Sequence, residues 1–421
     1  MTGAVFAIEG ACLTLGRFSL RAIDLELDAG EIMVLLGPNG AGKSVCLEMI
    51  AGFHRPTSGR ILIHDRDVTS LPPERRRVGL VFQNFGLFPH FTVAGNVSLG
   101  LHARRRVARA QATRGVGELL AQFGIAHLSD RYPQDLSPGE KQRVALARGL
   151  AAQPDLFLFD EPFSALDART RDALRDELKT FLRQSGAPAI FVSHDQTDAT
   201  LLADRVAVMN RGEILQIGAV PEVFRKPVNA FVAEFTGMEN ILAGRVLGQS
   251  GDLWRVQVAD TVLYAQGDDL PGNDASLCIR AEEVGLSMTD REGSLGLHGA
   301  TNRLAGTVTD TTSLGVITRV TVDCGFALVA YLTDRNVREL GLSSGREVVA
   351  EIEVGSIHLL RQDAKDCIAL SQERQSAGAV LIPQPWRSAA KGRAQGKACM
   401  KALARRAAPL GQTIRSAADS R

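Results

Sequence analysis

Residues 37–44 read Gly-Pro-Asn-Gly-Ala-Gly-Lys-Ser, a glycine-rich segment between two apolar segments. The preceding run, Ile32–Leu36, is short and entirely apolar, which is typical of a buried parallel strand. After the glycines, apolar residues recur at helical spacing from Val45 to Ile50, and Gly52 ends the pattern. The sequence therefore predicts a strand, a glycine loop and the N-terminus of a helix, in that order.

This arrangement predicts a loop that binds the phosphates of a nucleotide. Glycines let the backbone turn so that several N–H groups point at one anion, and the helix dipole favours the same anion. Lys43 is expected to reach the β- and γ-phosphates, and the Ser44 hydroxyl is expected to bind Mg²⁺. An accidental glycine-rich turn is the alternative, but all four fixed positions match in the right context. The expected nucleotide ligands are Gly37, Pro38, Asn39, Gly40, Ala41, Gly42, Lys43 and Ser44.

The composition is that of an ordinary soluble protein with two or three domains. The chain has 421 residues, 45% of them hydrophobic, and a formal net charge of +1, which gives no bias towards nucleic acid. No run approaches the roughly 18 apolar residues that cross a bilayer, and the N-terminus has no signal-peptide pattern. The six cysteines are scattered without a Cys-x-x-Cys pair. This spacing favours a reducing cytosol over a zinc site or a disulfide framework.

Polar side chains follow three further apolar segments that are predicted as strands. Gln83 follows the first, Asp160 and Glu161 follow the second, and His194 follows the third. Ligands of open α/β sheets bind at the carboxyl ends of the strands. There Asp160 can hold the magnesium through its hydration shell, and Glu161 can accept a proton from an attacking water. Considered singly, each of these residues could also be an ordinary loop residue. The strands are expected at 78–82, 156–159 and 189–192.

Residues 84–150 are predicted to be mostly helical. Ser137 is suited to the N-cap of a helix over residues 144–150, with Glu140 three positions later as in a capping box. Capping alone would explain both residues. An apolar loop precedes this helix, and either buried packing or a surface for a partner would account for it. Its residues are Phe85, Leu87, Phe88 and Phe91.

Together these segments resemble the ATP-binding subunit of ABC transporters. A phosphate-binding loop alone occurs in many NTPases, but six motifs in this order over about the first 235 residues are specific. They are Walker A at 37–44, the Q-loop glutamine Gln83, the signature at 136–140, Walker B at 156–160 followed by Glu161, the D-loop at 164–167, and the switch histidine His194.

The resemblance implies a head-to-tail homodimer that holds two ATP molecules between its subunits. Each ATP would contact Walker A of one subunit and Ser137 and Gly139 of the other, with Asp167 acting across the interface. The resemblance further assigns Glu161 as general base and Gln83 as a contact of Mg²⁺ and the lytic water. The remaining assignments are His194 for the γ-phosphate, and Ser44 and Asp160 for Mg²⁺.

Three positions depart from the common pattern of this family. The usual signature Leu-Ser-Gly-Gly-Gln is replaced here by a segment with Pro138 and Glu140. Proline donates no N–H, which removes one potential phosphate contact, although it suits a first helical turn. Leu15-Gly16 falls near the place of the aromatic residue that stacks on adenine, and Phe18 is the candidate substitute.

Beyond Gly237 the sequence changes to short alternating strands and glycine turns. One hairpin is predicted around residues 256–264 and another around 320–330, and helical spacing is confined to 336–340. A generic small β-barrel would also fit, but residues 279–284 resemble the C-terminal regulatory domain of importer ATPases. The predicted fold is thus an α/β P-loop NTPase (ABC ATPase) domain with a helical subdomain, followed by a β-rich OB-like (TOBE/Mop-like) domain.

Among importer ATPases, the sequence is most similar to those for molybdate and tungstate. Two stretches carry this similarity, residues 48–91 and 306–360. Sulfate, polyamine and ferric-iron importers share most of the pattern. The resemblance implies integral membrane permease subunits, a substrate-binding protein outside the membrane, and a peripheral position on the cytoplasmic face of the inner membrane. The rival classes, a soluble ABC ATPase without a transport role and an export ATPase, are disfavoured by the single P-loop and the β-rich C-terminus.

The predicted domains are 1–237 for nucleotide binding, with its helical subdomain at about 84–155, and 238–362 for the β-rich domain. Residues 363–421 form a basic segment predicted to be disordered, because apolar residues are too sparse for a core. From Trp386 to Arg421 there are nine Lys and Arg residues and one acid, Asp419. Contact with anionic lipid is the alternative for this segment.

Overall fold

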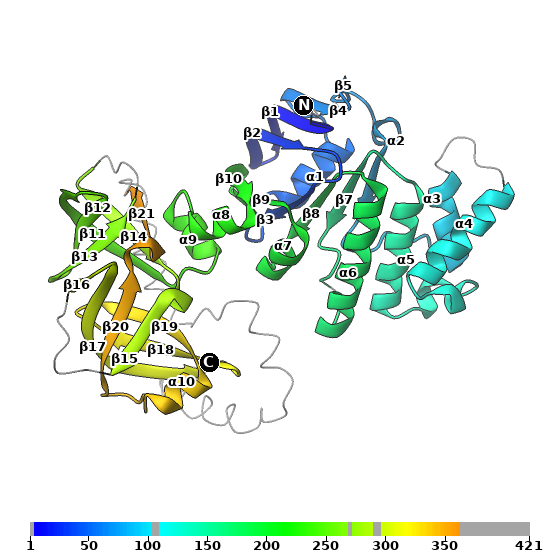
Figure 1. Cartoon of the computed structure of the whole chain (residues 1–421). Coiled ribbons are helices and arrows are strands. Elements are labelled where there is room, and N and C mark those ends of the chain that lie inside the picture. The colour runs from blue at the N-terminus through cyan, green and yellow to red at the C-terminus, as the bar shows by residue number, and fades with distance from the viewer. Residues whose placement is uncertain (1–3, 103–108, 165, 268–271, 289–295, 362–421) are drawn as a thin grey trace, which may run out of the picture.

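The computed structural model describes residues 4–102, 109–164, 166–267, 272–288 and 296–361. Side chains are described for all of these residues except those from 102 to 114. An α/β region, here residues 4–235, is followed by a β-rich region, residues 240–361. Figure 1 shows the two regions side by side, with α8 (Val220–Arg225) and α9 (Ala230–Phe235) between them. The domain boundaries at 237 and 362 stay predictions. The prediction for residues 363–421 falls outside the described residues.

The α/β region is built on a sheet of six strands in the order β10-β9-β3-β8-β7-β6. All of these run parallel except β10, which pairs antiparallel with β9. Both faces are buried, so alternate side chains enter different cores. In β3, Ile32, Val34 and Leu36 enter one core and Met33 and Leu35 enter the other. The strands are β3 (Ile32–Leu36), β6 (Val78–Val81), β7 (Leu156–Asp160), β8 (Ala189–Ser193), β9 (Arg205–Asn210) and β10 (Glu213–Ala219).

One face of this sheet is covered by helix α1 and by an antiparallel sheet in the order β2-β1-β4-β5. In β1, Phe6 and Ile8 are buried while Glu9 is exposed, as expected of a strand with one covered face. Buried Arg76 donates to the carbonyl oxygens of Met49 and Ile50 near the C-terminus of α1. The elements are α1 (Lys43–Ala51), α2 (Pro73–Arg76), β1 (Phe6–Leu15), β2 (Phe18–Leu27), β4 (Ser58–Ile63) and β5 (Arg66–Asp67).

Helices cover the opposite face, and α3, α4 and α5 lie together beside α6 (Figure 1). The mostly helical character predicted for residues 84–150 is therefore confirmed by the described elements. In α6 the apolar positions Leu174, Leu178 and Leu182 recur at helical spacing and are buried. The helices are α3 (Val93–His102), α4 (Arg109–Gln122), α5 (Pro138–Ala151), α6 (Ala168–Ser185) and α7 (Gln196–Leu202), with short 3₁₀ turns at Ala126–Leu128 and Pro133–Asp135.

The β-rich region contains two antiparallel sheets that share one core. Their orders are β13-β12-β11-β14-β21 and β15-β20-β17-β18-β19, with β16 paired to β17. Both predicted hairpins are confirmed, since Val256 pairs with Leu263 and Val320 pairs with Ala330. The predicted helix near 336–340 is α10 (Asp334–Glu339).

The strands of the first sheet are β11 (Asn240–Ser250), β12 (Leu253–Val258), β13 (Thr261–Gln266), β14 (Asp274–Ile279) and β21 (Ile357–Arg361). Those of the second are β15 (Val284–Met288), β16 (Gly296–His298), β17 (Thr301–Ser313), β18 (Ile317–Asp323), β19 (Ala327–Thr333) and β20 (Glu347–Glu353). Short 3₁₀ turns lie at Ala281–Glu283 and Val354–Ser356.

Buried side chains tie the start of β11 to the second sheet. The Asn240 amide donates to the carbonyl oxygen of Val329 at 2.9 Å and accepts from its N–H at 2.7 Å. The neighbouring Glu239 carboxylate accepts from Arg319 at 2.7 Å and from the Tyr331 hydroxyl. An amide with satisfied donor and acceptor groups fixes its neighbours more closely than apolar contact does. The entry into the β-rich region is thus held to both of its sheets.

Candidate functional site

Most of the sequence-predicted site residues gather where four parallel strands end. Because β3, β8, β7 and β6 are neighbours and point the same way, their carboxyl ends form one edge of the sheet. The glycine loop follows β3, Gln83 follows β6, Glu161 follows β7 and His194 follows β8. Four distant segments of the chain therefore meet at one place.

Glycine is required by close contacts within the loop at 37–44. A Cβ at Gly37 would lie 2.3 Å from the carbonyl oxygen of Met209 in β9. Gly42 has φ of 107°, and a Cβ there would lie 2.5 Å from the Phe18 ring. Any larger residue would displace the loop from the sheet or from Phe18. Phe18, the candidate for adenine stacking, thus packs directly on the loop.

Lys43 is buried at the N-terminus of α1, with 6% of its surface exposed. Its Nζ donates to the carbonyl oxygens of Gly37 at 2.8 Å and Pro38 at 3.0 Å. Burial lowers the pKa of Lys43, and the charges of Glu161 and Asp160 oppose that shift. The ammonium group is thus held inside the loop, where it can meet a phosphate.

Ser44 and Asp160 form an oxygen pair suited to Mg²⁺. The Ser44 hydroxyl donates to Oδ1 of Asp160 at 3.0 Å, joining α1 to the end of β7. Burial raises the pKa of Asp160, and the negative charges of Glu161 and Glu48 raise it further. A cation beside this carboxylate would favour its ionised form. Hydroxyl and carboxylate oxygens are ligands that Mg²⁺ prefers, so the residues present fit the ion.

Glu161 lies between Gln83 and His194. Its Oε2 accepts from the Gln83 amide at 3.1 Å, and its Oε1 lies 3.2 Å from Nδ1 of His194. Glu161 has φ of 46°, which L-residues adopt rarely, and its N–H donates to the carbonyl oxygen of Val192. The strained turn directs the carboxylate towards the two polar side chains, and one water between these groups would meet donors and an acceptor.

A buried network that the sequence analysis missed lies beneath His194. Asp198 accepts from Arg175 at 2.7 Å and from the Ser193 hydroxyl at 2.6 Å. The Ser193 Oγ in turn accepts from the backbone N–H of Asp195 at 3.0 Å. This buried network therefore holds both neighbours of His194, Ser193 and Asp195, in place. A recognisable signal existed, because Arg175 adjoins Leu174 in the apolar stripe of α6, where a charge requires a partner.

The structure does not bring Ser137, Gly139 or Asp167 to the glycine loop. No hydrogen bond or ion pair of the described residues joins any of them to positions 37–44. Ser137 caps α5, and the capping box predicted with Glu140 is confirmed. Asp167 caps α6 by accepting from the Thr170 N–H, and hydrogen bonding by the Thr170 side chain, followed by that of its N–H, lowers the pKa of the Asp167 carboxyl.

Aromatic residues near Gln83 lie partly in solvent. Phe53, Phe88 and Phe91 are 53%, 44% and 37% exposed. Phe85 and Leu87 instead pack against the core of the α/β region. Both alternatives for the apolar loop, buried packing and an exposed surface, therefore apply to different parts of it.

Comparison with known proteins agrees with this geometry. The ABC transporter family matches residues 20–164, and the TOBE domain matches residues 299–359. The molybdate/tungstate import ATP-binding protein WtpC of Pyrococcus horikoshii is 39% identical over 347 residues, which cover 82% of this chain and 96% of that protein. The chain belongs to the ATP-binding subunits of ABC importers. It is therefore an ATP hydrolase with the ABC ATPase fold and a C-terminal TOBE domain.

Other importer ATPases are nearly as similar. The spermidine/putrescine import ATP-binding protein PotA of Acidothermus cellulolyticus is 38% identical over 342 residues, covering 78% of this chain and 86% of that protein. The solved structure of the ATP-binding cassette MJ0796 with ADP and Pi has 28% identity and a TM-score of 0.47, and covers 51% of this chain and 98% of that one. Among the described residues, no helix combines the length and apolar character needed to cross a membrane.

Proposed function

We propose that this importer ATPase couples ATP hydrolysis to the uptake of molybdate- or tungstate-type oxyanions through separate membrane subunits. The observation that carries the ATPase mechanism is the position of Glu161 between Gln83 and His194, beside Lys43 and Ser44. The similarity to WtpC over nearly the whole of that protein supports the oxyanion cargo.

In the proposed reaction, Glu161 accepts a proton from the attacking water. The water oxygen forms a bond to the γ-phosphorus of ATP as the bond to the leaving β-phosphate oxygen breaks. Gln83 orients the water, and His194 contacts the γ-phosphate. Lys43 exchanges its two carbonyl partners for phosphate oxygens and stabilises the developing negative charge.

Magnesium would be held by the Ser44 hydroxyl and, through its hydration shell, by Asp160. When bound, Mg²⁺ supplies positive charge to the β- and γ-phosphate oxygens. The chain itself holds the Ser44 hydroxyl oxygen, at the start of α1, 3.0 Å from Oδ1 of Asp160, at the end of β7.

A second copy of the chain completes each nucleotide site in this proposal. Ser137 and Asp167 are exposed and Gly139 is partly exposed, although none contacts the glycine loop of its own subunit. In a head-to-tail homodimer these residues reach the ATP held by Walker A of the partner. Closure over two nucleotides is then favoured by ATP and lost on hydrolysis.

The exposed aromatic residues Phe53, Phe88 and Phe91 support a docking surface for the permease subunits. In this proposal the ATPase lies peripherally on the cytoplasmic face of the inner membrane, with a substrate-binding protein on the other side. The PotA relatives favour polyamine as the second candidate cargo. Sulfate and ferric iron are further alternatives among importers of this pattern.

Uptake measurements separate mechanism from cargo. Labelled molybdate, tungstate, sulfate, iron and putrescine are offered to cells that lack the gene and receive either the native chain or a variant. Glu161→Gln is expected to lower steady-state ATP hydrolysis by about 10²- to 10⁴-fold because the base is lost. Exposed Glu118 in α4 provides the control, Glu118→Gln.

Loss of molybdate or tungstate uptake that the native chain restores, and Glu161→Gln does not, would support both proposals. Loss of putrescine uptake alone would replace the cargo and leave the ATPase mechanism intact. Undiminished hydrolysis by Glu161→Gln would refute the assignment of the base.

A further inference from the structure

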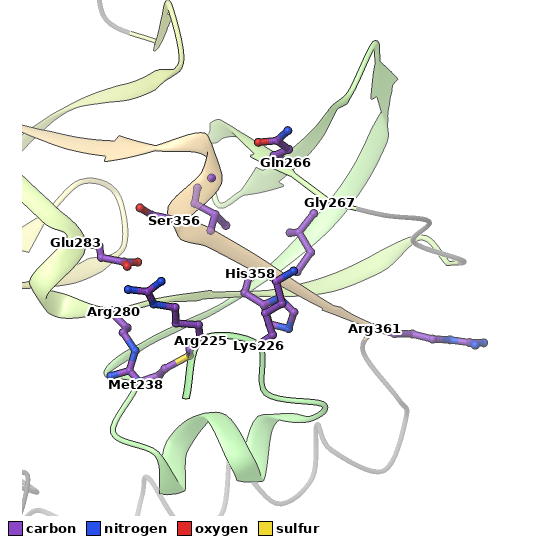
Figure 2. Close-up of a pocket in the computed structure, with 13 residues that line it drawn as sticks. Arg225, Lys226, Met238, Gln266, Gly267, Arg280, Glu283, Ser356, His358 and Arg361 are labelled. Carbon is purple, nitrogen blue, oxygen red and sulfur yellow. The ribbon is translucent and has the colours of Figure 1, made fainter. Parts of the chain in front are cut away.

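A cavity of about 560 Å³ lies where the α/β region meets the β-rich region. Figure 2 shows that its walls come from both sides, with Arg225 and Lys226 at the end of α8 and His358 and Arg361 on β21. Arg280, directly after β14, completes the basic lining. None of these residues belongs to the nucleotide site.

The charges of this cavity are unbalanced. Arg225, Lys226, Arg280 and Arg361 line it, whereas Glu283 is the one carboxylate among its lining residues. Within the described part of the chain, the side chains of Arg225, Lys226 and Arg361 form no ion pair and no hydrogen bond. Like charges held together without partners raise the free energy of the empty site, which an anion would lower.

Arg280 is positioned rather than free. Its Nη2 donates to the carbonyl oxygens of Phe224 at 2.5 Å and Thr236 at 3.4 Å, and its guanidinium carbon lies 5.8 Å from the centroid of the Phe224 ring. Burial lowers the pKa of Arg280, and the charges of Glu282 and Glu283 oppose that shift. Its fixed guanidinium is suited to bind an oxyanion.

The two walls are also joined directly. Nε2 of His358 on β21 lies 2.9 Å from the carbonyl oxygen of Pro227, next to Lys226. Burial lowers the pKa of His358, so the neutral ring donates this hydrogen bond. A ligand in the cavity would therefore contact groups whose relative position depends on how the two regions meet.

We propose that this junction cavity binds a small polyanion with phosphate- or sulfate-type groups. Arg225, Lys226 and Arg280 neutralise its charge. The volume exceeds that of a single tetrahedral oxyanion, so a ligand with at least two such groups fills it better. Binding connects α8 to β14 and β21 and so stabilises one arrangement of the two regions. The concentration of this polyanion can thereby regulate the ATPase separately from the nucleotide.

Calorimetric titration with inorganic pyrophosphate tests the proposal on the full chain. Two binding events are expected, one at the glycine loop and one at the junction. The variant Arg225→Gln/Lys226→Gln should weaken only the second, by at least about tenfold, because two charge-assisted contacts are lost. The matched control is Arg255→Gln/Arg338→Gln, which removes two exposed arginines of the β-rich region outside the cavity.

A thermal-unfolding series shows whether the variants fold. Without pyrophosphate, the Arg225→Gln/Lys226→Gln chain should be at least as stable as the native chain, because it loses two like charges. The control should unfold at the native temperature, since both of its arginines are exposed. With pyrophosphate, the Lys43→Ala chain should still gain stability through the junction. Equal second affinities in the two double variants would overturn the proposal. So would binding to vesicles of phosphatidylglycerol without binding to pyrophosphate or sulfate, because the site would then recognise a lipid surface.

Discussion

Replacing Arg175 by methionine would leave a buried carboxylate beneath His194 without its cation. Arg175 and Asp198 are 2% and 5% exposed. The guanidinium contacts Asp198 through Nε at 3.2 Å and Nη2 at 2.7 Å. In Arg175→Met, Asp198 keeps the Ser193 hydroxyl as its hydrogen-bond donor. Methionine fills a similar volume, so the loss of charge dominates over the loss of packing.

The expected cost follows from the burial of both partners. Removing one member of a buried ion pair costs roughly 3–5 kcal/mol. The third contact, from Nη1 to Asp172 at 2.7 Å, adds little because that carboxylate is 69% exposed. With about 2–4 °C lost per kcal/mol in a domain of this size, the unfolding midpoint should fall by roughly 6–20 °C.

Thermal and urea unfolding of the nucleotide-free chain measure this cost. Arg169→Met, which changes an exposed arginine on the same helix, is the matched control. The double variant Arg175→Met/Asp198→Asn should recover part of the loss, because no uncompensated charge is left in the core. If Arg175→Met were as stable as Arg169→Met, the argument that this pair supports the end of β8 would be wrong.

Two further changes concern the nucleotide site. Because folding raises the pKa of Asp160, the folded state binds this proton more tightly, and the contribution of this carboxyl to stability should fall as the pH rises above about 4. Urea unfolding at pH 4 and pH 7 without nucleotide should therefore show the native chain losing stability relative to Asp160→Asn as the pH rises, and an unchanged difference would contradict the raised pKa. The same variant should lose the stabilisation by Mg²⁺ and ATP. Phe18→Leu should raise the dissociation constant for ATP by roughly 5- to 150-fold if the ring stacks on adenine, whereas an unaltered constant in equilibrium binding would assign Phe18 to packing on Gly42 alone.

The local parts of the nucleotide site could be predicted because each is specified by adjacent residues. A strand, a glycine loop and a helix start follow one another at 32–44, so their geometry needs no distant partner. The capping box of Ser137 and Glu140 is local for the same reason. Hairpins at 256–264 and 320–330 were predictable from alternation and turns.

Features that depend on distant contacts were not predictable from the chain alone. The ion pair of Arg175 and Asp198 joins two helices, and only the fold shows which carboxylate faces the arginine. The placement of the glycine loop beside Glu161 and His194 depends on the pairing of β3 with β8, two strands that are not consecutive in the sequence. The junction cavity likewise requires α8 and β21 to meet.

The pairing of β14 with β21 has a consequence for folding. Ala275 in β14 pairs with Arg361, and the whole of the second sheet lies between them in the sequence. Closing such a long loop costs chain entropy before its contacts form, which slows folding. During synthesis one edge of β14 therefore stays unpaired until β15–β20 have left the ribosome, and an unpaired edge can template association with other chains. The pairing of β21 with β14 covers this edge and so removes the risk of association.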